Sequence, residues 1–175
     1  VAELVDLAHQ RHRHVTAGET SQVYPALARA DPDLFGVCVA SVDGAMYASG
    51  DTDVPFPIMS VAKPFVFALV LAHLGPEEAR RRIGVNATGM AFNSLAAVER
   101  GSDGRTNPMV NPGAIATTIL LPGTDEQKWQ CLADGLSRFA GHELDVDQEV
   151  YVRVGDESGQ PGRGPVARRP RLAGL

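Results

Sequence analysis

Ser60 and Lys63 stand three residues apart at the start of a strongly apolar segment. In a helix, side chains at this spacing lie on one face, where a hydroxyl and an amine can hydrogen-bond. A serine hydroxyl becomes a nucleophile when a base takes its proton, and a lysine shielded from water can be that base. The free N–H groups of a helix start also favour negative charge that develops there. The pair therefore predicts nucleophilic catalysis at a helix mouth.

A plainer interpretation of the same residues is also available. Ser60 can act as an ordinary helix cap while Lys63 extends to water. Between Val61 and Leu74, however, the only polar side chains are Lys63 and His73, so the helix is expected to be buried on most sides. An amine within such a segment favours the catalytic interpretation. Pro64 lacks an N–H group and is expected to distort the first helical turn.

Composition restricts the class of protein. The 175 residues are 44% hydrophobic and 21% charged, which is typical of one soluble globular domain. A net charge of −5 argues against a nucleic-acid or membrane-surface role. Cys38 and Cys131 do not suggest a disulfide framework and are expected to be buried thiols in a reducing compartment. No signal peptide opens the chain, and the apolar helix is too short to span a bilayer, so a cytoplasmic location is expected.

The remaining pattern predicts a hairpin followed by helices. The hairpin pairs residues 35–41 with 45–49 through a two-residue turn at Asp43-Gly44. Thr124 and Gln127 form a capping box before a helical stripe in which Trp129 is expected to be core. Helices are expected at residues 1–14, after Pro25, and at 60–74, 77–83, 90–98, 111–121 and 125–140. This order favours an α+β fold with an antiparallel sheet and clustered helices.

His9, His12 and His14 could suggest a metal site near the N-terminus. No carboxylate or cysteine joins them at ligand spacing, so a solvated, basic helix end is the better interpretation. Neither a metal nor a cofactor is expected.

Four motifs in one register connect the chain with a known family. They are Ala-Asp-Pro-Asp-Leu-Phe-Gly-Val at 30–37, Ser-Val-Ala-Lys-Pro at 60–64, Thr-Gly-Met-Ala-Phe-Asn-Ser at 88–94 and Asn-Pro-Met-Val-Asn-Pro-Gly-Ala-Ile at 107–115. In order and spacing, over about residues 16–150, the chain resembles the serine-dependent glutaminases. The resemblance implies a β-lactamase/transpeptidase-like fold, hydrolysis of L-glutamine to L-glutamate and ammonia, and a homo-oligomer.

The resemblance also implies roles for three residues. Ser60 matches the nucleophile, Lys63 matches its general base, and Asn111 matches the asparagine that holds the amino-acid end of the substrate. The implied path is attack of Ser60 on the carboxamide, loss of ammonia and hydrolysis of the glutamyl ester by water. The residue pattern alone gives Asn111 another role, as N-cap of a helix that Pro112 opens.

The chain departs from the family pattern in several places. Pro112 replaces an alanine, and Val23 replaces a tyrosine that contacts the substrate. Near the C-terminus, Gly155 stands where a glutamate belongs and Gly162 where an asparagine belongs. The expectation is therefore that residues 1–150 form the N-terminal part of a glutaminase catalytic domain, incomplete at its C-terminal end, and that residues 151–175 form a divergent, disordered tail.

Two alternatives to an active glutaminase, and one alternative interpretation of the tail, remain open from sequence. One is a non-catalytic fragment or assembly partner of a longer relative. Another is a β-lactamase or transpeptidase, although the expected Ser-x-Asn and Lys-Thr-Gly elements are not found. The third is a nucleic-acid arm in the arginine-rich stretch 161–175, for which a disordered tail is the preferred interpretation.

Overall fold

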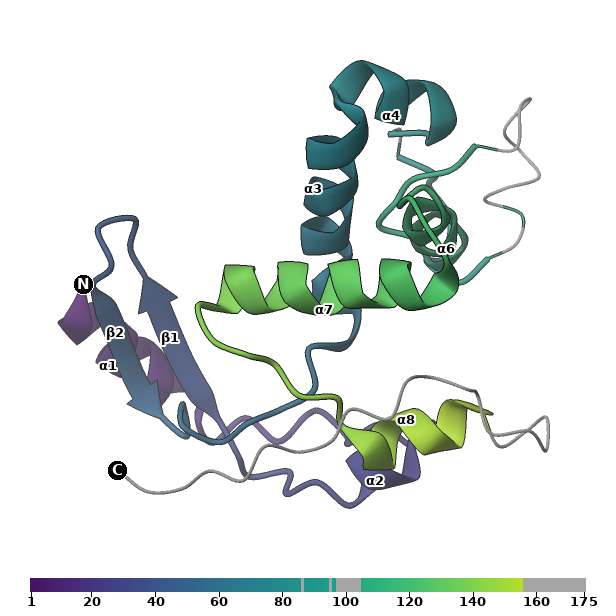
Figure 1. Cartoon of the computed structure of the whole chain (residues 1–175). Coiled ribbons are helices and arrows are strands. Elements are labelled where there is room, and N and C mark those ends of the chain that lie inside the picture. Colours follow the sequence, from purple (N-terminus) through teal and green to yellow (C-terminus); the bar gives the residue numbers. More distant parts are fainter. Residues whose placement is uncertain (86, 95, 97–104, 156–175) are drawn as a thin grey trace, which may run out of the picture. The chain divides into compact units, whose positions relative to one another are not determined.

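The computed structural model describes residues 1–85, 87–94, 96 and 105–155 (Figure 1). The chain divides into two compact units. Of the described residues, the first unit contains Val1–Pro57 and Val146–Gly155, and the second contains those between Ile58 and Asp145. Helices and a small antiparallel sheet are both present, as expected for an α+β fold.

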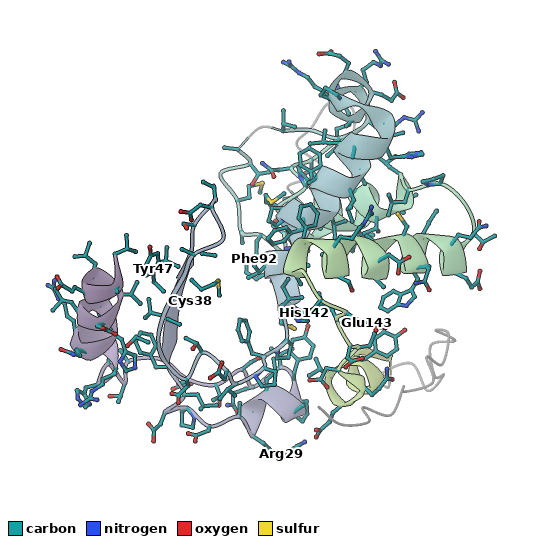
Figure 2. The ribbon with its side chains drawn as sticks, turned by 60° about the vertical axis from the view of Figure 1, so that its left-hand side comes forward. Arg29, Cys38, Tyr47, Phe92, His142 and Glu143 are labelled. Atoms are coloured by element: carbon teal, nitrogen blue, oxygen red, sulfur yellow. The ribbon has the colours of Figure 1, made fainter. Side chains whose placement is uncertain are left out.

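The first unit is built on a hairpin that packs against helix α1 (Ala2–His12). Strand β1 (Gly36–Ala40) pairs antiparallel with β2 (Met46–Gly50). Because side chains alternate across a strand, the two faces of the hairpin carry different residues. Tyr47 points toward α1 and Cys38 points to the opposite face (Figure 2). Cys38 is therefore exposed, and the expectation of a buried thiol was wrong.

The hairpin turn differs slightly from the expected one. Ser41 N–H donates to Ala45 O at 2.9 Å, so three residues, Val42 to Gly44, separate the last paired positions. Gly44 adopts a φ of +87°, which glycine reaches without a steric penalty. The Asp43 carboxylate accepts from the Ser41 hydroxyl and from Ala45 N–H, and these bonds lower the pKa of Asp43. The Asp-Gly signal thus located the turn correctly but gave its length one residue short.

Two short helices complete the first unit. Helix α2 (Pro25–Ala28) begins at a proline, as predicted, and lies against α8 (Gln148–Gly155). An ion pair joins Arg29 to Glu149, and because both side chains are largely exposed it contributes little stability. Helix α8 extends into the stretch predicted as a disordered tail. The rest of that stretch, 156–175, lies outside the described residues.

Helix α3 (Ala62–Leu74) is the centre of the second unit. It contacts the other helices described in this unit (Figure 1) and follows a short 3₁₀ turn, the distortion expected next to Pro64. The elements within its described residues are η1 (Met59–Val61), α3 (Ala62–Leu74), α4 (Pro76–Arg82), α6 (Asn111–Ile119) and α7 (Asp125–Ala140). The buried apolar side chains of this unit are Val70, Ala79, Ile83, Val110 and Leu121.

Local signals explain where these helices begin and end. Gly75, at a φ of +79°, closes α3, and Pro76 opens α4. The predicted capping box is present at the start of α7, where Thr124 and Gln127 exchange backbone and side-chain hydrogen bonds. Gly141 closes α7 in the left-handed conformation.

Helix α7 crosses α3 at a glycine. A Cβ atom at Gly135 would lie 2.4 Å from Leu69 Cδ1, so only a residue without a side chain lets the helices approach this closely. On the same helix Trp129 is 38% exposed, and the prediction that it is a core residue was wrong. A hydrophobic stripe on a helix shows which side chains share a face, but its burial depends on what covers that face.

Three further expectations need correction. Most α3 side chains are only partly covered, and Val70 is the one that is fully buried. Cys131 is half-buried rather than buried. Residues 90–94 form an irregular turn where a helix had been predicted for 90–98, and most of the remainder of that segment lies outside the described residues.

Across the described ranges, no single helix has the length and apolar character needed to cross a membrane. Met59–Leu74 and Pro76–Arg82 reach that length only as a pair bent by 116°.

Candidate active site

Ser60 lies on the 3₁₀ turn that leads into α3, and its side chain is exposed. The preceding residue, Met59, adopts a φ of +46°, a left-handed conformation that is uncommon for a residue with a side chain. Such a conformation costs of order 1 kcal/mol and is frequent at functional sites. The strain at Met59 turns the chain sharply just before the serine. No sequence signal indicated it.

The Lys63 amine is held by two carbonyl oxygens. Lys63 Nζ donates to Asn111 Oδ1 at 2.6 Å and to Met109 O at 3.3 Å. The side chain is half-buried, so these contacts replace part of the water that would surround an exposed amine. The structure therefore brings Lys63, from the start of α3, together with Asn111, from the start of α6.

Asn111 does not cap its helix. The N-cap of α6 is Val110, in extended conformation, and Asn111 is already the first helical residue. Its side chain accepts from Lys63 and its backbone N–H donates to Phe92 O at 2.7 Å. The N-cap prediction was wrong because the asparagine oxygen is used by an amine from another helix.

A tight turn before α6 sets the position of Asn111. Asn107 Oδ1 accepts from Met109 N–H at 2.8 Å, and Asn107 O accepts from Val110 N–H at 3.1 Å. The helix then folds back onto this turn, because a Cβ atom at Gly113 would lie only 1.9 Å from Asn107 O. Gly113 is thus required by the approach of two backbone segments, which places Asn111 within reach of Lys63.

The expected hydrogen bond between Ser60 and Lys63 is not formed. Within the described part of the chain, the Lys63 amine donates to Met109 and Asn111, and no hydrogen bond joins it to Ser60 Oγ. The amine nevertheless does not extend freely into water, as the simple capping interpretation required. Hydrogen bonds between catalytic groups are often absent without substrate and form in the complex.

Phe92 is a site residue that the sequence did not single out. Its ring centroid lies 5.8 Å from Lys63 Nζ, and its backbone oxygen holds Asn111. The side chain is 61% exposed and is labelled in Figure 2. Its position inside the motif at 88–94 was the available signal, because that motif lies between the segments carrying Lys63 and Asn111.

The chain is similar to known proteins over most of its length. The Glutaminase family model matches residues 18–160. "Glutaminase 2" of Yersinia pestis is 57% identical over 152 residues, which are 86% of this chain and 45% of that protein. The solved structure of the probable glutaminase ybaS superposes with a TM-score of 0.83 at 31% identity, covering 90% of this chain and 51% of that one.

A third relative was solved with a ligand. The probable glutaminase from Bacillus subtilis complexed with 6-diazo-5-oxo-L-norleucine has a TM-score of 0.72 at 25% identity and covers 89% of this chain and 46% of its own. The chain thus spans about half the length of the relatives it matches. The matched segment contains Ser60, Lys63 and Asn111, and its fold is the predicted one. The chain belongs to the glutaminase family.

Proposed function

We propose that this protein hydrolyses L-glutamine to L-glutamate and ammonia through an acyl-enzyme on Ser60. The observation that carries the proposal is the contact between Lys63 Nζ and Asn111 Oδ1 at 2.6 Å. This contact joins Lys63, the expected base, to Asn111, the residue expected to hold the substrate. The family to which the chain belongs is named for glutaminase activity.

Lys63 is proposed as the general base. A neutral amine has two N–H groups, and the oxygens of Met109 and Asn111 provide two acceptors for them. The nitrogen lone pair is then free in the remaining tetrahedral direction to take the Ser60 proton. Lys63 lies three residues after Ser60, on the same face of the helix. In the complex with substrate, its side chain needs only to rotate toward the 3₁₀ turn to reach Ser60.

The proposed reaction has two halves. Ser60 Oγ attacks the carboxamide carbon while its proton passes to Lys63, and the developing negative charge is held by N–H groups at the helix mouth. The C–N bond then breaks, Lys63 returns the proton to the leaving nitrogen, and ammonia departs. Water adds to the glutamyl ester with Lys63 again as base, which releases glutamate and restores Ser60.

Asn111 is proposed to orient the substrate. Because its Oδ1 accepts from Lys63, its Nδ2 group is left to donate to an acceptor such as the substrate carboxylate. This placement supports the role that the resemblance implies for the amino-acid end of glutamine.

The proposal extends to setting and assembly. Both cysteines are free thiols, which supports a reducing, cytoplasmic location. The exposed hairpin face around Cys38 leaves apolar surface available for assembly into a homo-oligomer, as the family resemblance implies. The proposal includes no metal, cofactor, nucleic acid or membrane.

The test is ammonia release from L-glutamine by the purified chain. Ser60→Ala and Lys63→Met should each lower the rate by at least about 10²-fold, because each removes a group that takes part in the bond-making step. Lys128→Met, on α7, is the matched control and should keep the wild-type rate. An equal rate in wild type and Ser60→Ala, including no release from either, would refute the proposal in favour of a non-catalytic fragment.

A further inference from the structure

Phe92 contacts both members of the Lys63–Asn111 pair through different parts of the residue. Its ring lies 5.8 Å from the Lys63 amine, and its backbone oxygen accepts from Asn111 N–H at 2.7 Å. Lys63 in turn donates to Asn111 at 2.6 Å. The three residues therefore form a closed cycle of contacts between segments far apart in the sequence.

The ring completes the surroundings of the amine. Met109 O and Asn111 Oδ1 accept hydrogen bonds from its N–H groups, and the ring lies 5.8 Å away, close enough to attract the cation that forms when the amine takes a proton. Phe92 is itself 61% exposed, whereas Lys63 is half-buried. Because the ring is this exposed, replacing it should cost little stability, so a variant at this position tests the contact with Lys63 and not the packing of the core.

We infer that Phe92 is a positioning residue for Lys63: its ring holds the amine against Asn111 and covers it from water, while its backbone fixes Asn111. When Lys63 takes the Ser60 proton, the same ring face also stabilises the ammonium that forms. The kinetic part of this inference rests on the proposed function. The structural part does not.

The division between ring and backbone makes the inference testable. Replacing the side chain removes the contact with Lys63 but leaves the backbone oxygen that holds Asn111. Phe92→Leu should therefore lower kcat about two- to fivefold and leave KM unchanged, whereas a general disturbance of the site would alter both. Phe92→Tyr keeps an aromatic ring at this position, so its kcat should stay close to that of the wild type.

A second readout is independent of activity. Lys63 and Lys128 are the lysines of this chain, so acetylation by limiting acetic anhydride, followed by peptide mass spectrometry, compares one amine with the other. In the wild type Lys63 should react more slowly than Lys128, and in urea the two rates should become equal. Phe92→Leu removes the ring that covers the amine and should therefore raise the ratio of Lys63 to Lys128 labelling. Phe92→Tyr should leave it at the wild-type value.

The control is Phe56→Leu, which changes another exposed phenylalanine, 82% accessible, and should leave the ratio unchanged. An unchanged ratio in Phe92→Leu would overturn the inference, and so would an equal rise in Phe92→Tyr. Labelling does not require turnover. Its result can therefore overturn the inference on Phe92 without bearing on the activity test with Ser60→Ala, and the activity test can fail without affecting the labelling.

Discussion

Gly113→Ala tests how closely the start of α6 must approach the preceding turn. The added Cβ would lie 1.9 Å from Asn107 O and 2.6 Å from its carbonyl carbon, both backbone atoms that no side-chain rotation can remove. Separations under 3.0 Å are essentially never seen, so the two segments must move apart by about 1.1 Å. A shift of that size is enough to stretch the 2.6 Å contact between Lys63 and Asn111 beyond hydrogen-bonding distance.

The energetic result combines three effects. Overpacking typically costs about 1–3 kcal/mol, and loss of a hydrogen bond costs about 0.5–1.5 kcal/mol. Alanine is a better helix former than glycine by about 1 kcal/mol, which offsets part of this loss. Gly113→Ala should therefore lower the free energy of unfolding by roughly 1–3 kcal/mol.

Urea denaturation followed by circular dichroism measures this difference. Gly18→Ala is the matched control, because a Cβ atom there meets nothing within 4 Å, and it should be neutral or slightly stabilising. Limited acetylation should also show faster reaction of Lys63 relative to Lys128 in Gly113→Ala. Wild-type stability and wild-type labelling in this variant would refute the argument that the close approach positions Asn111.

Three other predictions concern stability and surface chemistry. Thr124→Ala removes the α7 cap and should lower the free energy of unfolding by about 1 kcal/mol in urea melts, so a neutral result would argue against the capping box. Hydrogen bonds from Arg81 and Arg82 hold the pKa of Glu78 below its ordinary value of 4.5. The ionised Glu78 side chain therefore stabilises the fold above pH 4.5, and this stabilisation is lost as the pH falls through the lowered pKa. Glu78→Gln should therefore destabilise at neutral pH but not in strong acid, and equal effects at both would contradict this. Finally, Cys38 is exposed and should react with a thiol reagent faster than the half-buried Cys131. Mass spectrometry of the labelled peptides measures both rates, and equal rates would contradict the exposed position of Cys38 on the hairpin.

Elements with strong local signals could be predicted from sequence. Gly75-Pro76 ends one helix and starts the next, Thr124 and Gln127 cap α7, and Asp43-Gly44 marks the hairpin. Each signal acts within a few residues, so it is independent of the rest of the fold.

Features that depend on distant segments could not be predicted. Asn111 looked like an N-cap because its partner, Lys63, is 48 residues away in sequence. Trp129 looked like core because a stripe does not reveal what covers it. The strained φ of Met59 and the contact of Phe92 with the amine follow from packing between segments, for which the sequence carried no local rule.

Sequence motifs nevertheless indicated which residues to consider as a candidate site. Ser60, Lys63 and Asn111 were selected from their types and spacing together with the family resemblance, and the structure brings the last two into contact. What the motifs did not provide is the arrangement around the amine, in which Met109 and Phe92 take part through backbone atoms and a ring.

The most direct test of the central claim, that Lys63 activates Ser60 as nucleophile, is covalent trapping with 6-diazo-5-oxo-L-norleucine, the ligand of the Bacillus subtilis relative. In this reaction the diazo carbon takes up a proton, equivalent to the one that the serine gives up. The serine oxygen then bonds to that carbon as the C–N bond breaks and dinitrogen leaves. Intact mass and peptide mapping should show one adduct, on Ser60, that is lost in Ser60→Ala, strongly slowed in Lys63→Met and unchanged in Lys128→Met. An adduct that forms equally well in Lys63→Met, that maps to another residue, or that does not form at all would contradict the claim.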